Sequence, residues 1–169
     1  RGSLIKLGNG EGPVWGPNLI AYTVWVGSGK TVSKQVWTVD PKIHNASTAT
    51  QLTHWKAPKN STESGPMSVL WTPNGKSIIG QIWADVDVKA ISINAATGKI
   101  TTIDKNDSYF ETPLAVSSNS SSVLVLYASQ APTSNIAYGT VNVVSVTGTT
   151  NSLFLNHVNW LSASADWTP

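Results

Sequence analysis

The sequence predicts an all-β protein, specifically a segment of a β-propeller built from four-stranded antiparallel blades. Two observations carry this prediction: a strand-turn-strand unit recurs along the 169 residues, and short polar turns separate alternating apolar segments. A third is that no stretch of eleven or more residues shows the 3.6-residue apolar spacing of an amphipathic helix. We therefore expect almost no helix. A β-sandwich is the alternative, because short antiparallel strands also build sandwiches.

The repeated unit is clearest in residues 68–80. An apolar segment ends in a large aromatic residue at Trp71, a Thr-Pro-Asn-Gly turn follows, and a second apolar segment starts at Ile78. Pro73 fixes its own φ, and Gly75 supplies the positive φ that such a turn requires. These residues predict two antiparallel strands joined by a tight turn.

Less complete copies of this unit occur elsewhere in the chain. The first has a Gly-Pro pair, an apolar residue, Trp15 and a turn with proline and asparagine. A later copy has Val116 at the tryptophan position and lacks the turn proline, and a last one begins near Trp167. Positions 15, 71, 116 and 167 are 45 to 56 residues apart. This period suits one four-stranded blade, which needs about 40–50 residues.

The predicted organisation is one propeller-like domain over residues 4–169, because residues 1–3 resemble a cleavage remnant. Three blades are expected at approximately residues 12–55, 66–104 and 112–156. Residues 4–7 and 164–169 would contribute a fourth-position strand and the start of a first-position strand to a partial blade. Closed propellers have four or more blades. We therefore expect an arc of a larger ring, completed by further chain or by association of copies into a homo-oligomer.

Composition limits the function classes and the location. Charged residues make up 12% of the chain and the formal net charge of +2 is scattered, so nucleic acid is not an expected partner. Cysteine is absent, which excludes a disulfide framework and a thiolate metal site. No apolar run approaches the roughly 20 residues of a membrane helix, so this segment is not expected to insert into a membrane. The Ser-, Thr-, Asn- and Gly-rich polar surface suits an extracellular or bacterial cell-envelope protein.

Residues 69–79, Val-Leu-Trp-Thr-Pro-Asn-Gly-Lys-Ser-Ile-Ile, resemble the Trp-Ser-Pro-Asp-Gly-Lys repeat of TolB-type β-propellers. The Gln-Leu-Thr run at residues 51–53 resembles the outer-strand ending of that family. The resemblance extends over nearly the whole chain and implies a six- or seven-bladed propeller, commonly exported and used for protein binding. In related proteins the same propeller is a gate or docking domain attached to a serine peptidase of the prolyl oligopeptidase group. The motif itself carries no catalytic or binding residues.

No catalytic motif stands out, and we expect neither enzyme activity, nor a cofactor, nor a metal site in this chain. There is no Gly-x-Ser-x-Gly nucleophile elbow. His44, His54 and His157 are in no metal-ligand spacing. Asp85 and Asp87 form an Asp-x-Asp pair, but one pair supplies too few oxygens for Ca²⁺, so solvated loop charge is the favoured interpretation.

The chain contains eight tryptophans, a high number for its length. Four are expected in the core between blades, three of them at the repeat position: Trp15, Trp37, Trp71 and Trp167. Four others fall near strand ends: Trp25, Trp55, Trp83 and Trp160. At such positions a tryptophan can stack on a sugar or anchor a protein partner, although packing under a loop is favoured for each.

Propeller geometry places the loops between second and third strands, and the connections between blades, on one face. Aromatic and acidic residues converge there: Trp83, Asp85, Asp87, Asp107, Tyr109, Phe110, Glu111, His157, Asn159 and Trp160. Converging loops of this composition are the best binding-surface candidate in the sequence.

Three functions remain open at this stage. The favoured hypothesis is a non-catalytic binding or sensing module of an exported or membrane-anchored protein, which recognises a protein or another ligand through loops on one face. The alternatives are the gating or docking portion of a larger hydrolase of the prolyl oligopeptidase kind, and a carbohydrate-binding propeller, suggested by the tryptophans.

Overall fold

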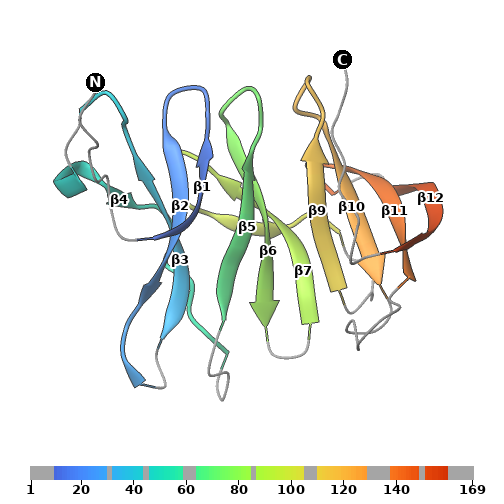
Figure 1. The fold of residues 1–169 in the computed structure, drawn as a ribbon, viewed down its shortest axis with the longest axis horizontal. Helices are drawn as coiled ribbons and strands as arrows, with labels where there is room; N and C mark the ends of the chain where they lie inside the picture. The colour runs from blue at the N-terminus through green and yellow to red at the C-terminus, as the bar shows by residue number, and fades with distance from the viewer. Residues whose placement is uncertain are drawn as a thin grey trace.

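The structure, a computed structural model, describes residues 10–29, 32–43, 46–58, 64–84, 87–104, 110–128, 138–148 and 151–159. Within these ranges the chain forms twelve β-strands and one short 3-10 turn, η2 (Ala46–Thr48) (Figure 1). The predicted all-β fold is confirmed. Among the described residues no helix is long and apolar enough to cross a membrane.

The strands form three consecutive antiparallel meanders, one for each blade. Blade 1 contains β1 (Glu11–Trp15), β2 (Ile20–Val26), β3 (Ser33–Val39) and β4 (Thr50–Gln51). Blade 2 contains β5 (Gly65–Trp71), β6 (Ser77–Ala84), β7 (Asp87–Asn94) and β8 (Ile100–Thr102). Blade 3 contains β9 (Phe110–Val116), β10 (Ser122–Ala128), β11 (Tyr138–Ser145) and β12 (Asn151–Asn159).

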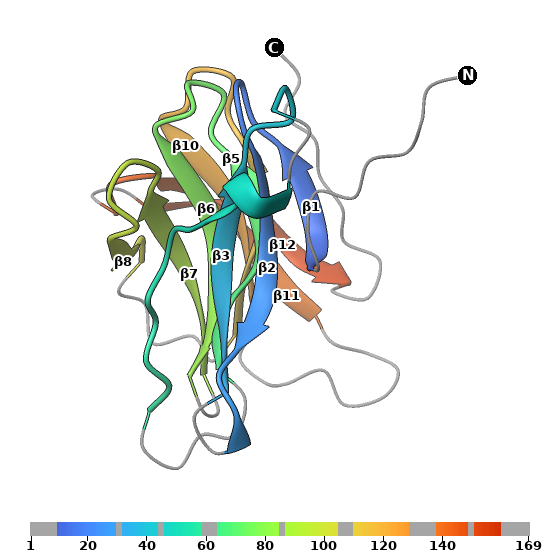
Figure 2. The same ribbon diagram turned by 90° about the vertical axis from the view of Figure 1, so that its left-hand side faces the viewer.

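The blades pack against one another in chain order. The first strand of blade 2, β5, contacts β1, β2 and β3 of blade 1, and β9 of blade 3 contacts β5, β6 and β7 of blade 2. Among the described residues, the parallel pair Val88 and Phe110 joins blades 2 and 3 as one hydrogen-bonded sheet. Figure 1 shows the blades following one another from left to right, and Figure 2 looks along this row from the side of blade 1, with the strands of each blade spread across the view. The arrangement is a propeller segment, and the β-sandwich alternative is wrong.

Blade 2 is buried on both faces, and its sequence explains how. Successive residues of a strand point to opposite faces of the sheet. Ile78 accordingly packs in an apolar cluster with Ala21 and Val36 of blade 1. Its neighbour Ile79 packs in a second cluster with residues of blade 3, including Val123. The continuous apolar run of β6 therefore supplies the core of both junctions.

The turns between first and second strands are built from side-chain hydrogen bonds. In blade 2, Asn74 Oδ1 accepts from Thr72 Oγ1 and Lys76 N at 2.9 Å each. In blade 3, Asn119 Oδ1 accepts from Ser117 Oγ at 2.7 Å and from the amide nitrogen of residue 121 at 3.0 Å. The copy without the turn proline thus keeps the same turn, because a hydroxyl and an asparagine two residues later recur.

Glycine in the turn between third and fourth strands is required by the neighbouring blade. Gly98 and Gly148 occupy equivalent turns with φ of 69° and 73°. A Cβ on Gly98 would collide with the carbonyl oxygen of Leu52, and one on Gly148 with that of Ile103. Each turn therefore seats its glycine on the outer segment of the preceding blade, where a side chain has no room.

One core prediction is wrong and another is refined. Trp15 is 72% exposed, because no described residue covers that side of blade 1. Trp71, at the equivalent position of blade 2, is half-buried against blade 1, where its indole lies so close to Gly16 that a Cβ there would overlap the ring. Trp37 packs at the edge of a small cluster with Ile20 and Tyr22. Trp167 lies outside the described residues.

Candidate functional site

Two opposite ends of the blades carry different features. The ends at which β2 joins β3 and β6 joins β7 lie at the bottom of Figure 1, and we call them the loop face. The ends with the β1–β2, β5–β6 and β9–β10 turns lie at the top, and we call them the turn face. Two exposed tryptophans, Trp25 at 39% and Trp83 at 44%, lie near the loop-face ends of β2 and β6.

Trp25 is part of a charged cluster with Lys34 and Glu11. Trp25 and Lys34 are cross-strand partners in β2 and β3, and the Lys34 ammonium lies 5.1 Å from the centroid of the indole. The same ammonium is 2.7 Å from Glu11 Oε2. The Lys34 side chain is only 11% exposed, whereas that of Glu11 is 63% exposed. A buried cation therefore holds an exposed ring and an exposed carboxylate together at the surface.

Trp55 has a structural role behind this surface. Gln35 Oε1 accepts from Trp55 N at 2.8 Å and from Thr53 Oγ1 at 3.0 Å, which anchors the segment after β4. Trp55 Nε1 donates to Ser64 Oγ at 2.9 Å, and this hydroxyl donates to the carbonyl oxygen of Trp83 at 2.6 Å. The two exposed tryptophans thus sit on a support fixed by buried hydrogen bonds.

The start of β7 gathers three of the residues singled out in the sequence. Asp87 pairs with Ala84, and the next residue, Val88, pairs with Trp83 on one side and with Phe110 on the other. Asp87 and Phe110 are half-buried. The sequence placed Asp87 and Phe110 in loops, but each of them begins a strand. The strand ends therefore bring the backbones of Trp83, Asp87 and Phe110 close together, but Asp87 shares a face of the sheet with Ala84, and Trp83 shares the other face with Val88.

Glu111 does not lie on the open surface where the sequence placed it. Its side chain is fully buried between blades 2 and 3. Glu111 Oε2 accepts from Ala90 N at 2.8 Å, and Oε1 lies 3.2 Å from Lys89 Nζ. Burial raises the pKa of Glu111, while the Ala90 hydrogen bond and the Lys89 charge oppose that rise. This carboxylate is an element of the junction rather than a surface ligand.

The remaining predicted residues divide into two groups. His157 and Asn159 lie in β12, which continues further than the sequence suggested. Four lie outside the described residues: Asp85, Asp107, Tyr109 and Trp160. In the part of the chain that the structure describes, no group of three or more His, Cys, Asp or Glu side chains could hold a metal ion.

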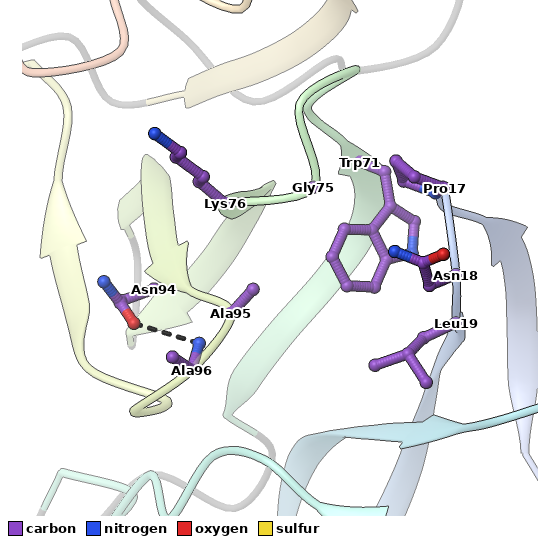
Figure 3. A pocket seen from close by; sticks show the side chains of 9 residues that line it. All are labelled: Pro17, Asn18, Leu19, Trp71, Gly75, Lys76, Asn94, Ala95 and Ala96. Atoms are coloured by element: carbon purple, nitrogen blue, oxygen red, sulfur yellow. Dashed lines mark hydrogen bonds between the residues drawn. The ribbon is translucent and has the colours of Figure 1, made fainter.

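The turn face carries a pocket that the sequence did not indicate, with a volume of about 400 Å³ between blades 1 and 2 (Figure 3). Three turns contribute its lining residues: Pro17, Asn18, Leu19, Trp71, Gly75, Lys76, Asn94, Ala95 and Ala96. Figure 3 shows Trp71, Pro17, Asn18 and Leu19 on one side, facing Lys76, Asn94 and the two alanines on the other.

A shorter turn in blade 1 explains this pocket. In blades 2 and 3 the closing hydrogen bonds join Thr72 N to Ser77 O and Ser117 N to Ser122 O, five residues apart in each case. In blade 1 Gly16 N donates to Leu19 O, only three residues on. The space that a longer turn would fill stays open beside Trp71. A comparison of turn lengths among the repeats would have been the sequence signal.

Together, three meanders in face-to-face packing define the chain as a β-propeller segment. Its fold is that of TolB-type propellers. TolB from Acinetobacter baumannii matches 88% of the chain with a TM-score of 0.58 and 12% identity. A chain from a study of two prolyl endopeptidases matches 88% with a TM-score of 0.62 and 9% identity. An oligogalacturonate lyase in complex with manganese matches 76% with a TM-score of 0.50 and 11% identity.

The chain matches only part of each of these larger proteins. The chain corresponds to 32% of the TolB chain, 22% of the prolyl endopeptidase chain and 35% of the lyase chain. No protein-family model and no curated protein matches the sequence. At these identities the likeness establishes the fold, and the activities of the larger proteins are not transferred with it.

Proposed function

We propose that this chain is a binding or sensing module of an exported protein and that it recognises a protein partner through the loop face. The observation that carries the proposal is the presence of two exposed tryptophans, Trp25 and Trp83, at the same end of adjacent blades. Tryptophan is the residue type most enriched among the energetic hot spots of protein interfaces. The low charge content and the Ser- and Thr-rich surface support an extracellular or cell-envelope location.

The electrostatics of the loop face also support this proposal. Lys34 is neutralised by Glu11, so the charge that borders Trp25 is paired. A charge that is paired and largely buried can orient a binding partner, and the partner need not be strongly charged itself. A partner with apolar anchors and a few polar groups at the rim fits this surface.

A binding experiment on the intact chain tests the role of the loop face. Envelope proteins of the source cell would be cross-linked to the chain through a photoreactive amino acid at Gln81, beside Trp83 on β6, and the captured partner identified and purified. Titration with that partner should then show that Trp25→Ala and Trp83→Ala each weaken binding by at least tenfold, which corresponds to about 1.4 kcal/mol.

Trp15 provides the matched control. It is an even more exposed tryptophan, but it lies at the turn-face end of β1. At concentrations where the copies are dissociated, Trp15→Ala should leave the affinity for the partner unchanged. Equal affinities for the Trp25→Ala, Trp83→Ala and unsubstituted chains would overturn the proposal. A glycan array is the parallel test of the carbohydrate-binding alternative, which predicts a signal that disappears in Trp83→Ala.

The second candidate function is the gating or docking part of a larger hydrolase. It is supported by the prolyl endopeptidase chain, which matches 88% of this chain. Here too the chain itself would be non-catalytic, and the loop face or the turn face would contact a catalytic domain. Peptidase activity that appears only when an α/β-hydrolase domain is present on the same polypeptide would favour this function over the first.

Association between copies belongs to the same proposal. Exposed apolar residues lie on both open sides of the arc, Trp15 on blade 1 and Leu153, Phe154 and Leu155 on β12. At the two observed junctions the neighbouring blade covers the corresponding sides. Two copies placed head to tail would cover both sides in one ring. Sedimentation should then show a dimer that Phe154→Ser converts to a monomer, and a monomer at all concentrations would contradict this part.

A further inference from the structure

We infer that the turn-face pocket between blades 1 and 2 binds a small carboxylate with a flat apolar body. The pocket is separate from the loop face, so this inference does not depend on the function proposed above. Its volume of about 400 Å³ falls within the range of roughly 300–1,000 Å³ that small-molecule sites occupy. It arises because the β1–β2 turn is two residues shorter than its counterparts.

One wall of the pocket selects for a flat apolar group. Trp71, Leu19 and Pro17 line it, and Figure 3 shows the six-membered ring of the indole turned toward the opposite wall. Trp71 is held in this position from behind, because its ring lies directly on Gly16, where a Cβ would overlap it. A rigid aromatic face of this kind favours an offset-stacked or edge-to-face ring as its partner.

The opposite wall selects for a negative charge. Lys76 is the charged residue of this wall, and none of the described residues that line the pocket is acidic. Lys76 forms no ion pair with any of the described residues. Asn94 Oδ1 accepts from Ala96 N at 3.0 Å and Thr97 N at 2.9 Å, which fixes the turn that carries this wall. A lysine charge with no acidic side chain among the described lining residues suits a carboxylate ligand.

The floor of the pocket is rigid. Ala95 N donates to the carbonyl oxygen of Lys76 at 3.0 Å, which joins the β5–β6 and β7–β8 turns. Asn74 Oδ1 fixes the first of these turns through Lys76 N. The groups that would contact a ligand therefore sit on turns held by backbone and Asx hydrogen bonds, so ordering them on binding costs little entropy.

The other junction shows that the pocket is not a general consequence of the repeat. Between blades 2 and 3, Val116 stands in place of Trp71, and Ser120 Oγ accepts from Asn74 N at 3.0 Å across the turns. The full-length β9–β10 turn and this hydrogen bond bring the two blades together at the turn face. The aromatic wall and the open space occur together at the first junction.

The test uses indole-3-acetate as probe and its neutral analogue indole-3-acetamide as reference, titrated into the intact ¹⁵N-labelled chain. Indole-3-acetate should produce saturable shifts in the amide signals of Gly75, Lys76, Ala95 and Ala96. The acetamide should bind about two- to fivefold more weakly, as the loss of one surface ion pair predicts. Lys76→Ala should reduce the affinity for the acetate to that for the acetamide.

Two control variants keep the test decisive. Lys42→Ala removes the same charge from an exposed site elsewhere in blade 1 and should leave both affinities unchanged. Ala96→Trp fills the pocket from an exposed position, so the variant should fold normally and lose binding of both probes. The inference is overturned if acid and amide bind equally to the unsubstituted chain, if neither shifts the four signals, or if Ala96→Trp binds as before.

Discussion

The junction between blades 1 and 2 and the junction between blades 2 and 3 use the same strand order but bury different groups. At the first, a neutral amide, Gln35, holds the segment after β4 through Trp55. At the second, a carboxylate, Glu111, holds β7 through Ala90 N and pairs with Lys89. The two junctions therefore share their backbone arrangement and their apolar layers, but they differ in the polar group that each one buries.

This difference has energetic consequences. A buried amide with all its hydrogen bonds satisfied is insensitive to pH, whereas a buried carboxylate carries a desolvation cost that its partners must offset. The first junction is also open at the turn face, where the short turn leaves a pocket, and the second is closed there by Asn74 and Ser120. We expect the second junction to be the more sensitive to substitution and the first to be the site of ligand exchange.

The largest predicted effect is that of Glu111→Ala. The substitution leaves Ala90 N without its acceptor and removes the ion pair that Lys89 forms with a fully buried carboxylate. Breaking a buried ion pair by removing one partner costs about 3–5 kcal/mol, and since the Lys89 side chain is partly exposed we expect about 3 kcal/mol. Urea unfolding measures this loss. Glu11→Ala, which breaks the exposed ion pair with Lys34, should change stability by less than about 1 kcal/mol. Similar losses for the two variants would show that Glu111 is not buried as described.

Next in size is the difference between Trp71→Ala and Trp15→Ala, two substitutions at the same repeat position. Trp71 is half-buried against blade 1, so its truncation should cost about 2–3 kcal/mol, less than the 3–5 kcal/mol of a fully buried tryptophan. Trp15 is exposed, and its truncation should remain within about 0.5 kcal/mol. Equal effects in urea unfolding at low protein concentration would mean that Trp15 is covered in solution, as association between copies would produce.

A smaller effect concerns pH and should appear only at the second junction. Burial raises the pKa of Glu111 in the folded chain above its ordinary value of 4.5, so the folded state binds this proton more tightly than the unfolded state. The stability contributed by that proton is fully present below the unfolded pKa and is lost as pH rises through the folded pKa. The unfolding free energy of the unsubstituted chain should therefore increase relative to Glu111→Gln as pH falls from neutral to about 4.5. A constant difference over this window would contradict the raised pKa.

Much of the fold followed from local signals in the sequence. Proline and glycine at the β5–β6 turn, and glycine at position 98, mark backbone conformations that few other residues adopt, so the strand boundaries next to them could be predicted. The position of Trp71 at the end of an alternating strand also placed it correctly against another blade. Such signals depend on a residue and its neighbours in the chain, which a sequence displays directly.

The candidate sites were less predictable, because they depend on contacts between distant segments. A glutamate at position 111 is typical of an exposed loop. Its side chain is buried because β9 lies against β7 of the neighbouring blade. The stacking of Lys34 on Trp25 requires the register of β2 against β3. The pocket depends on a turn that is two residues shorter in one repeat, which becomes visible only when the turn lengths of the repeats are compared.

The smallest predicted effect compares two equivalent bulges. Each of the first strands in blades 1 and 2 is irregular three residues before its tryptophan, with Gly12 at a φ of 56° and Ser68 at 51°. A left-handed conformation suits glycine and costs a residue with a Cβ about 1 kcal/mol. Ser68→Gly should thus stabilise the chain by about 0.5–1 kcal/mol, since the hydrogen bond that its hydroxyl accepts from Gln81 is exposed. Gly12→Ser should destabilise by a similar amount, because a Cβ there meets no atom within 4 Å and strain alone acts. Urea unfolding of both variants would contradict the equivalence of the bulges if the two changes had the same sign.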